Sequence, residues 1–135
     1  MPYEKPPFFV RAVFNRLAMA TGVSGSCTLV TPGRSTGEAR RVPVIPVEHE
    51  GARFIVSTRG DSDWVRNARA SGTIELQCRG GGSGPFHAIE VPVEQRDPII
   101  AAYRAKAGRT VETYWRKRPD PLDHPTFRLE PAAPA

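Results

Sequence analysis

Six short runs with strand character follow one another after residue 25, and their spacing limits the chain to a small set of folds. The run from Ile74 to Arg79 alternates between apolar and polar residues, which is typical of a strand with one buried and one solvated face. A chain of 135 residues has the length of one ordinary domain, and six strands in such a domain predict a small β-barrel. The predicted strands are Cys27–Thr31, Val42–Val47, Arg53–Thr58, Thr73–Arg79, His87–Val93 and Thr126–Leu129.

Turn and cap signals divide the rest of the chain. Glu48–Gly51 and Gly80–Pro85 lie between predicted strands and are typical of hairpin connections. Capping residues and stop signals predict three short helices, over residues 64–70, 99–106 and 111–117. The sequence therefore predicts a mainly β (α+β) single domain over residues 1–135, with helices flanking the barrel.

The N-terminal segment shows a helical pattern instead of strand-like runs. Val10, Val13, Phe14 and Leu17 recur at helical spacing and predict an amphipathic helix over about residues 7–20. Packing of this helix on the domain is the favoured interpretation, and contact with a membrane surface stays open. Polar residues interrupt the centre that a signal peptide would need, and no run approaches the roughly 18 apolar residues that cross a bilayer. We therefore expect a cytoplasmic protein, with peripheral membrane contact as the alternative.

Cysteines and histidines give no metal-binding pattern. Cys27 and Cys78 form no Cys-x-x-Cys motif, and we expect them as two half-buried thiols in a reducing compartment rather than as a stapling disulfide. His49, His87 and His124 are far apart in sequence and have no acidic or cysteine partner at ligand spacing, so no metal site is predicted. No serine elbow and no His-Glu-x-x-His motif is present, which disfavours hydrolases.

The charge balance favours an anionic partner. Nineteen Lys and Arg against 14 Asp and Glu leave a formal net charge of +5. A phosphorylated cofactor, a nucleic acid or an acidic membrane surface would all fit this excess. Nucleic-acid binding by a basic barrel needs aromatic side chains gathered on a strand face, whereas Phe54, Phe86 and Phe127 are scattered. We therefore expect no nucleic-acid partner.

One predicted hairpin, over residues 31–43, combines glycines, hydroxyl side chains and three arginines. Glycines allow backbone N–H groups to approach an anion, and the guanidinium groups of Arg34 and Arg40 can donate paired hydrogen bonds to phosphate. A solvated basic hairpin explains the same residues equally well. Adjacent strand residues point to opposite faces, so Arg40 and Arg41 are not expected to reach the same site.

A second cluster of donors follows the third predicted strand. Ser57-Thr58-Arg59-Gly60 leads to the predicted start of the helix that carries Trp64 and Asn67. Helix N-termini favour anions, although simple capping by Asp61 and Asp63 is an equally good interpretation. Trp64 is interpreted as a core residue in preference to a ring on a cofactor, and Asn67 either orients a carbonyl group or covers the surface.

These motifs together resemble one known family. The order Thr31…Gly33-Arg34-x-x-Gly37-x-x-Arg40-x-x-Pro43, then Ser57-Thr58-Arg59-Gly60, then Asp63-Trp64-Val65-Arg66-Asn67-Ala68-Arg69-Ala70, is similar to that of the deazaflavin (F420)-dependent nitroreductases of actinobacteria. The resemblance extends to Glu90-Val91-Pro92, to Ile99–Tyr103 and to His124–Leu129, which is nearly the whole chain.

The resemblance implies an FMN-binding-like split β-barrel that holds coenzyme F420, a hydride carrier with an anionic phosphate and polyglutamate tail. It implies a reductase whose acceptor is a quinone, a nitro compound or an activated alkene, working as a monomer or homodimer. The implied cofactor-binding residues are Arg34, Ser35, Thr36, Gly37, Arg40, Val56, Ser57, Thr58, Arg59, Trp64 and Asn67. Tyr103 and Tyr114 are the candidate proton donors, with packing as the alternative role.

One residue departs from the family pattern. The usual turn is Gly-Arg-Lys-Ser-Gly, whereas this chain has Ser35 in place of the lysine. The loss of that charge keeps a second function open, a noncatalytic barrel that binds a fatty acid or another lipid. FMN is the nearest competing cofactor.

Overall fold

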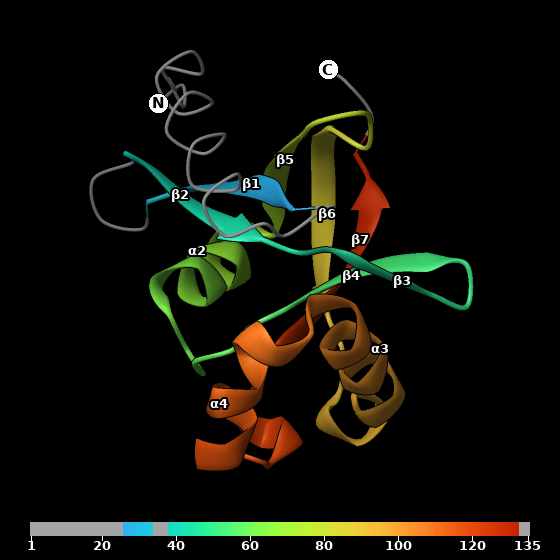
Figure 1. The fold of residues 1–135 in the computed structure, drawn as a ribbon. Coiled ribbons are helices and arrows are strands. Elements are labelled where there is room, and N and C mark those ends of the chain that lie inside the picture. Colours follow the sequence, from blue (N-terminus) through green and yellow to red (C-terminus); the bar gives the residue numbers. More distant parts are fainter. Residues whose placement is uncertain (1–25, 34–37, 133–135) are drawn as a thin grey trace.

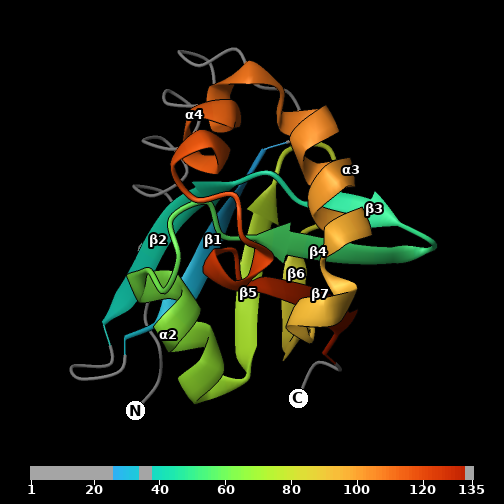
Figure 2. The same cartoon turned by 90° about the horizontal axis from the view of Figure 1, so that it is seen from below.

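The computed structural model describes residues 26–33 and 38–132, which form one curled antiparallel sheet with three α-helices (Figures 1 and 2). The strand order in the sheet is β2-β1-β5-β6-β7-β4-β3, and every pairing is antiparallel. The strands are β1 (Cys27–Pro32), β2 (Ala39–Val44), β3 (Val47–His49), β4 (Ala52–Val56), β5 (Thr73–Cys78), β6 (Gly84–Glu90) and β7 (Thr126–Pro131).

The curling of the sheet follows from its connectivity. The two edge strands, β2 and β3, are consecutive in the chain, and only Ile45 and Pro46 separate them. Because so short a link spans only a few ångströms, the two edges must approach each other. The sheet therefore bends toward closure, and the predicted split-barrel architecture is confirmed.

A strand is present in each predicted region, but two of the predictions need correction. The strand predicted over 87–93 is β6, which begins earlier, at Gly84 within the predicted hairpin connection, and ends at Glu90. The sequence predicts a continuous strand over 42–47, whereas the structure ends β2 at Val44 and begins β3 at Val47. Pro46 lacks an N–H group for a ladder hydrogen bond, so the chain can leave one edge there and join the other. The hairpin between β3 and β4 is confirmed, since Glu50 and Gly51 have φ values of 52° and 81°.

The three predicted helices of the described region are confirmed as α2 (Asp63–Ser71), α3 (Asp97–Ala107) and α4 (Arg109–Lys117). Short 3₁₀ turns span Val93–Gln95 and Pro121–Asp123. Gly72 ends α2 in the left-handed region at φ 74°, as its sequence position predicts. The predicted helix over 7–20 lies outside the described residues, and no helix within them is long and apolar enough to cross a membrane.

Two apolar clusters share β4 as a common wall. The inner cluster packs the concave side of the sheet against Trp64, Val65 and Ala68 of α2. The outer cluster packs β3 and β4 against α3 and α4, which lie together on one side of the sheet in Figure 2. Along β4, Ile55 belongs to the inner cluster while Phe54 and Val56 belong to the outer one. This strand is therefore apolar on both faces.

The cysteines correct the sequence-based expectation. Cys27 on β1 and Cys78 on β5 are directly opposite each other, with Cα atoms 4.4 Å apart, and they form a disulfide. Their separation of 51 residues hides this pairing in the sequence, because only the strand register makes them neighbours. The expectation of two separate thiols was wrong.

Candidate functional site

The base of the hairpin between β1 and β2 is closed by a tight backbone contact. The N–H of Gly33 donates to the carbonyl of Glu38 at 2.8 Å. A Cβ atom on residue 33 would lie 2.5 Å from that carbonyl oxygen, so only glycine fits without a shift of the backbone. The four residues between them, Arg34, Ser35, Thr36 and Gly37, lie outside the described residues.

Arg40 lies on the inner face of β2, near this hairpin. It is directly opposite Thr31 of β1 and shares its strand face with Val42 and Val44, which pack against the inner cluster. Its side chain is exposed and forms no ion pair with a described acidic residue. Arg41 lies opposite Val30 and belongs to the other face of β2, as predicted.

A buried polar contact fixes α2 beneath this end of β1. Asn67 Nδ2 donates to Thr31 Oγ1 at 3.1 Å, and the two residues are only 2% and 0% exposed. Trp64, one turn earlier on α2, packs in the inner cluster with its ring centroid 5.7 Å from that of Phe127. Asn67 and Trp64 are thus held by internal contacts, which leaves Arg40 as the accessible cation of this group.

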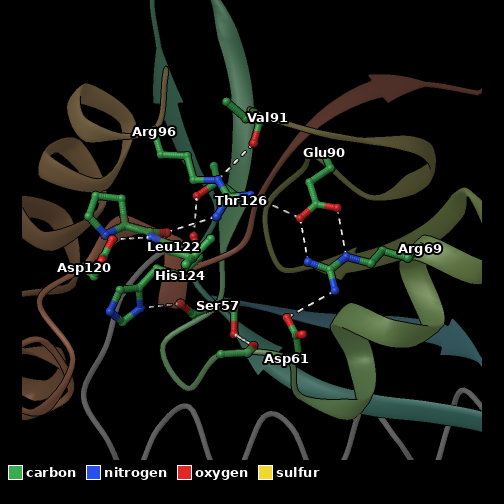
Figure 3. A network of polar contacts seen from close by, with 12 residues as sticks. Ser57, Asp61, Arg69, Glu90, Val91, Arg96, Asp120, Leu122, His124 and Thr126 are labelled. Atoms are coloured by element: carbon green, nitrogen blue, oxygen red, sulfur yellow. Dashed lines mark hydrogen bonds and ion pairs between the residues drawn. The ribbon is translucent and has the colours of Figure 1, made fainter. Parts of the chain in front are cut away.

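The segment after β4 divides into buried and accessible residues. Val56 and Ser57 are 5% and 1% exposed, and the Ser57 hydroxyl donates to Gly60 O at 2.7 Å. The Ser57 carbonyl faces His124 Nδ1 at 2.9 Å (Figure 3). Thr58 is half-buried and Arg59 is exposed, so these two can reach a ligand from this segment.

An ion-pair network joins this segment to three other elements (Figure 3). Arg69 of α2 donates two hydrogen bonds to Glu90, at 2.8 and 2.7 Å, and approaches Asp61 to 3.1 Å. Arg96 lies 3.2 Å from the same Glu90 carboxylate and also donates to the carbonyls of Val91 and Pro121. This network could not be recognised from the sequence, because the ion-paired residues are 6 to 21 positions apart and lie on different elements.

The two candidate tyrosines lie in a different environment. Tyr103 is 5% exposed in the outer cluster, and burial, with a smaller effect from Tyr114, raises its pKa to about 12. Tyr114 is half-buried against the same cluster. Both are therefore positioned by α3 and α4, on the other side of β4 from the inner cluster.

A chain of ring contacts links Tyr103 to the segment after β4. The Tyr103 and Trp115 ring centroids are 5.8 Å apart, and Trp115 stacks on His124 with centroids 3.9 Å apart. His124, fully buried, then contacts the carbonyls of Ser57 and Arg118, at 2.9 and 2.6 Å. The sequence assigned no site role to His124. Only the fold shows that His124 lies between Trp115 and the Ser57 carbonyl.

A cavity of about 710 Å³ lies elsewhere, between the start of β1, the end of β5 and α3. Its lining includes the Cys27–Cys78 disulfide and Arg53. None of the predicted cofactor-binding residues that the structure describes belongs to this lining. The cavity and the Arg40 region are therefore separate features.

Comparison with solved structures defines the fold class as the split β-barrel. A protein from Clostridium acetobutylicum, related to general stress protein 26 and described as belonging to the pyridoxinephosphate oxidase family, is 13% identical. The match covers 91% of this chain and 83% of that protein, with a TM-score of 0.56. At this identity the likeness concerns the fold alone.

More similar chains point to one branch of this class. A structure described as an F420-H2 dependent reductase is 27% identical, with 79% of this chain and 95% of that chain covered and a TM-score of 0.61. A second structure, described as a domain-swapped dimer, is 24% identical over 93% of this chain and all of that one, also with a TM-score of 0.61. The F420H(2)-dependent quinone reductase family model matches residues 12–119. The chain belongs to this family, and its cofactor is coenzyme F420.

The residues present fit this cofactor. An anionic phosphate tail needs an accessible cation that no carboxylate neutralises, and Arg40 meets this condition among the described residues. The net charge of +5 is of the complementary sign. The predicted family resemblance is thus confirmed, while the roles of individual residues remain predictions.

Proposed function

We propose that the chain reduces an electron-poor organic acceptor, with a quinone, a nitro compound or an activated alkene as the substrate class. Family membership supports the reductase activity. The observation that carries the site is the position of Arg40, an exposed cation on the inner strand face beside α2, directly opposite Thr31. The acceptor class follows from the cofactor, because reduced F420 supplies a hydride.

Arg40 would hold the phosphate tail, close to the base of the hairpin that the Gly33–Glu38 hydrogen bond closes. Arg34, Ser35, Thr36 and Gly37 are assigned to the same tail by the sequence pattern. Thr58 and Arg59 would contact the ring side, with Val56 and Ser57 as the buried support beneath them. Asn67 would act by fixing α2 against β1, and Trp64 by packing α2 on Phe127 of β7.

The proton required by the reduced product is assigned to a phenol. Burial raises the pKa of Tyr103 to about 12, which makes its phenol a weaker acid, and the side chain is only 5% exposed. A donor must recover its proton from water after each turnover. Tyr114, which is half-buried, meets this need better than Tyr103, so we place it first.

Titration of the purified protein with F420, followed by deazaflavin fluorescence, tests the site. Arg40→Ala should weaken binding about tenfold, because one charge-assisted contact is lost. Arg109→Ala, which removes the same charge from the exposed start of α4, is the matched control and should bind as the wild type does. Equal affinity of the wild type and both variants for F420 would show that Arg40 does not contact the cofactor.

Two further ligands separate the competing functions. FMN and a fluorescent fatty acid are titrated under the same conditions. Micromolar F420 binding with reduction of a model quinone supports the proposal. Tight fatty-acid binding without F420 binding would instead make the protein a lipid carrier and would refute it.

A further inference from the structure

The cavity beside the disulfide has a chemistry that the reductase activity does not use. Both cysteines of the disulfide line the cavity, and Cys78 is half-buried whereas Cys27 is 3% exposed. Three cationic side chains, Arg53, Arg79 and Lys106, line the same cavity with a single carboxylate, that of Glu48. A small anionic molecule that enters this space therefore meets the disulfide, with Cys78 as its more exposed residue, in a mainly positive surrounding.

Arg53 is held directly against both sulfur atoms. Its Nη2 lies 3.6 Å from Cys78 Sγ and 3.9 Å from Cys27 Sγ. Its Nη1 donates to the Gly82 carbonyl at 2.7 Å, and its guanidinium carbon lies 5.6 Å from the centroid of the Phe86 ring. These contacts fix the guanidinium where negative charge develops when a disulfide opens. A fixed cation beside a sulfur atom stabilises the thiolate and makes it a better leaving group.

We propose that this cavity is a thiol–disulfide exchange site, in which small anionic thiols reduce the Cys27–Cys78 bond reversibly. The thiolate of the first reagent molecule attacks Cys78 Sγ, and the bond to Cys27 breaks with its electron pair on Cys27. A second thiolate attacks the reagent sulfur of the mixed disulfide and releases Cys78. Two reagent thiols are oxidised to one disulfide, and the two protein thiolates take up protons from water. The site is independent of F420 binding.

The first test uses the unmodified protein. Its reduction is followed by alkylating the protein thiols after exposure to 2-mercaptoethanesulfonate, 2-mercaptoethanol or cysteamine at equal thiolate concentrations. The anionic reagent should react at least about threefold faster than the cationic one at low salt, and high salt should remove the difference. The rate should also rise in proportion to the thiol concentration.

The second test concerns Arg53. Arg53→Gln should slow reduction about tenfold, whereas Arg53→Lys, which keeps the charge, should stay closer to the wild type. Arg79→Gln removes a charge from the same cavity at an exposed side chain that has no contact with the sulfur atoms among the described interactions. It should change the rate of the anionic reagent less than Arg53→Gln does.

Three results would overturn the proposal. Two free thiols in the unreduced, denatured protein would show that the disulfide does not form. A rate that does not depend on thiol concentration would mean that reduction follows local unfolding rather than attack in the cavity. Equal rates for the anionic and cationic reagents at low salt would show that the reagents do not react within the positively charged cavity. This test uses only the unmodified protein.

Discussion

The two apolar clusters on either side of β4 contain different kinds of reactive group. The inner cluster contains the disulfide cysteine Cys27, and its other buried members are apolar side chains. The outer cluster contains Tyr103, whose pKa is raised to about 12, and reaches His124 through Trp115. We infer that the inner cluster is sensitive to redox conditions and the outer cluster to pH, although one strand separates them.

The largest expected effect concerns the inner cluster. Replacing both cysteines (Cys27→Ala and Cys78→Ala) should lower the free energy of unfolding by about 4 kcal/mol, since the disulfide closes a loop of 51 residues in the unfolded chain. Urea unfolding of the oxidised wild type and the double variant measures this difference. Reductant should destabilise the wild type and leave the variant unchanged. Equal stability of the two proteins under oxidising conditions would contradict the prediction.

The next effect concerns the outer cluster. Burial raises the pKa of Tyr103 to about 12 in the folded chain from its ordinary value of 10.0, so above pH 10 the folded state keeps the proton that the unfolded state loses. The stabilisation is complete below pH 10 and is lost between pH 10 and 12, by about 2–3 kcal/mol. Tyr103→Phe should remove this part of the alkaline decline, measured by urea unfolding at several pH values. Parallel declines in both proteins would contradict it.

A smaller effect is expected at the buried hydrogen bond between Asn67 of α2 and Thr31 of β1. Asn67→Ala should destabilise the protein by about 2 kcal/mol, because it leaves the buried Thr31 hydroxyl without the amide donor. The same variant should weaken F420 binding, since α2 loses its side-chain hydrogen bond to β1. Arg66→Ala, at an exposed position of the same helix, is the control and should change stability by less than about 0.5 kcal/mol. Similar losses in both variants would show that the helix, not the buried contact, is responsible.

The smallest effect concerns the ion-pair network around Glu90, which includes Arg69 of α2 and Arg96. Glu90→Gln removes the charge that Arg69 and Arg96 share and should cost about 1 kcal/mol, because the pairs are only partly shielded from water. Glu130→Gln breaks an exposed pair with Arg128 and should be close to neutral. Thermal unfolding at low and high salt compares the two. If Glu130→Gln lost as much stability as Glu90→Gln, the burial of Arg96 would not strengthen its ion pair with Glu90.

Much of the fold could be predicted because its signals are local. Alternation of apolar and polar residues marked β5, and Gly72 marked the end of α2, since each depends on residues a few positions apart. The break at Pro46 was missed, because the local pattern does not show that β2 and β3 lie at opposite edges of the sheet.

The candidate site was only partly predictable for the same reason. Arg40, Thr58 and Arg59 were identified from their motifs, and the structure leaves all three at least partly accessible. His124, Glu90 and Arg96 were not identified as a set of contacts, because their partners lie on other elements. No local pattern encodes those contacts.

The sequence by itself determined the strands, the helices of the described region and the family, since these depend on periodicity, capping residues and short motifs. Only the tertiary structure decided which residues meet across strands. The register of β1 against β5 turned two cysteines 51 positions apart into a disulfide beside Arg53. The physical reason is that contacts between distant segments depend on strand order and register, which the closing of the whole sheet fixes.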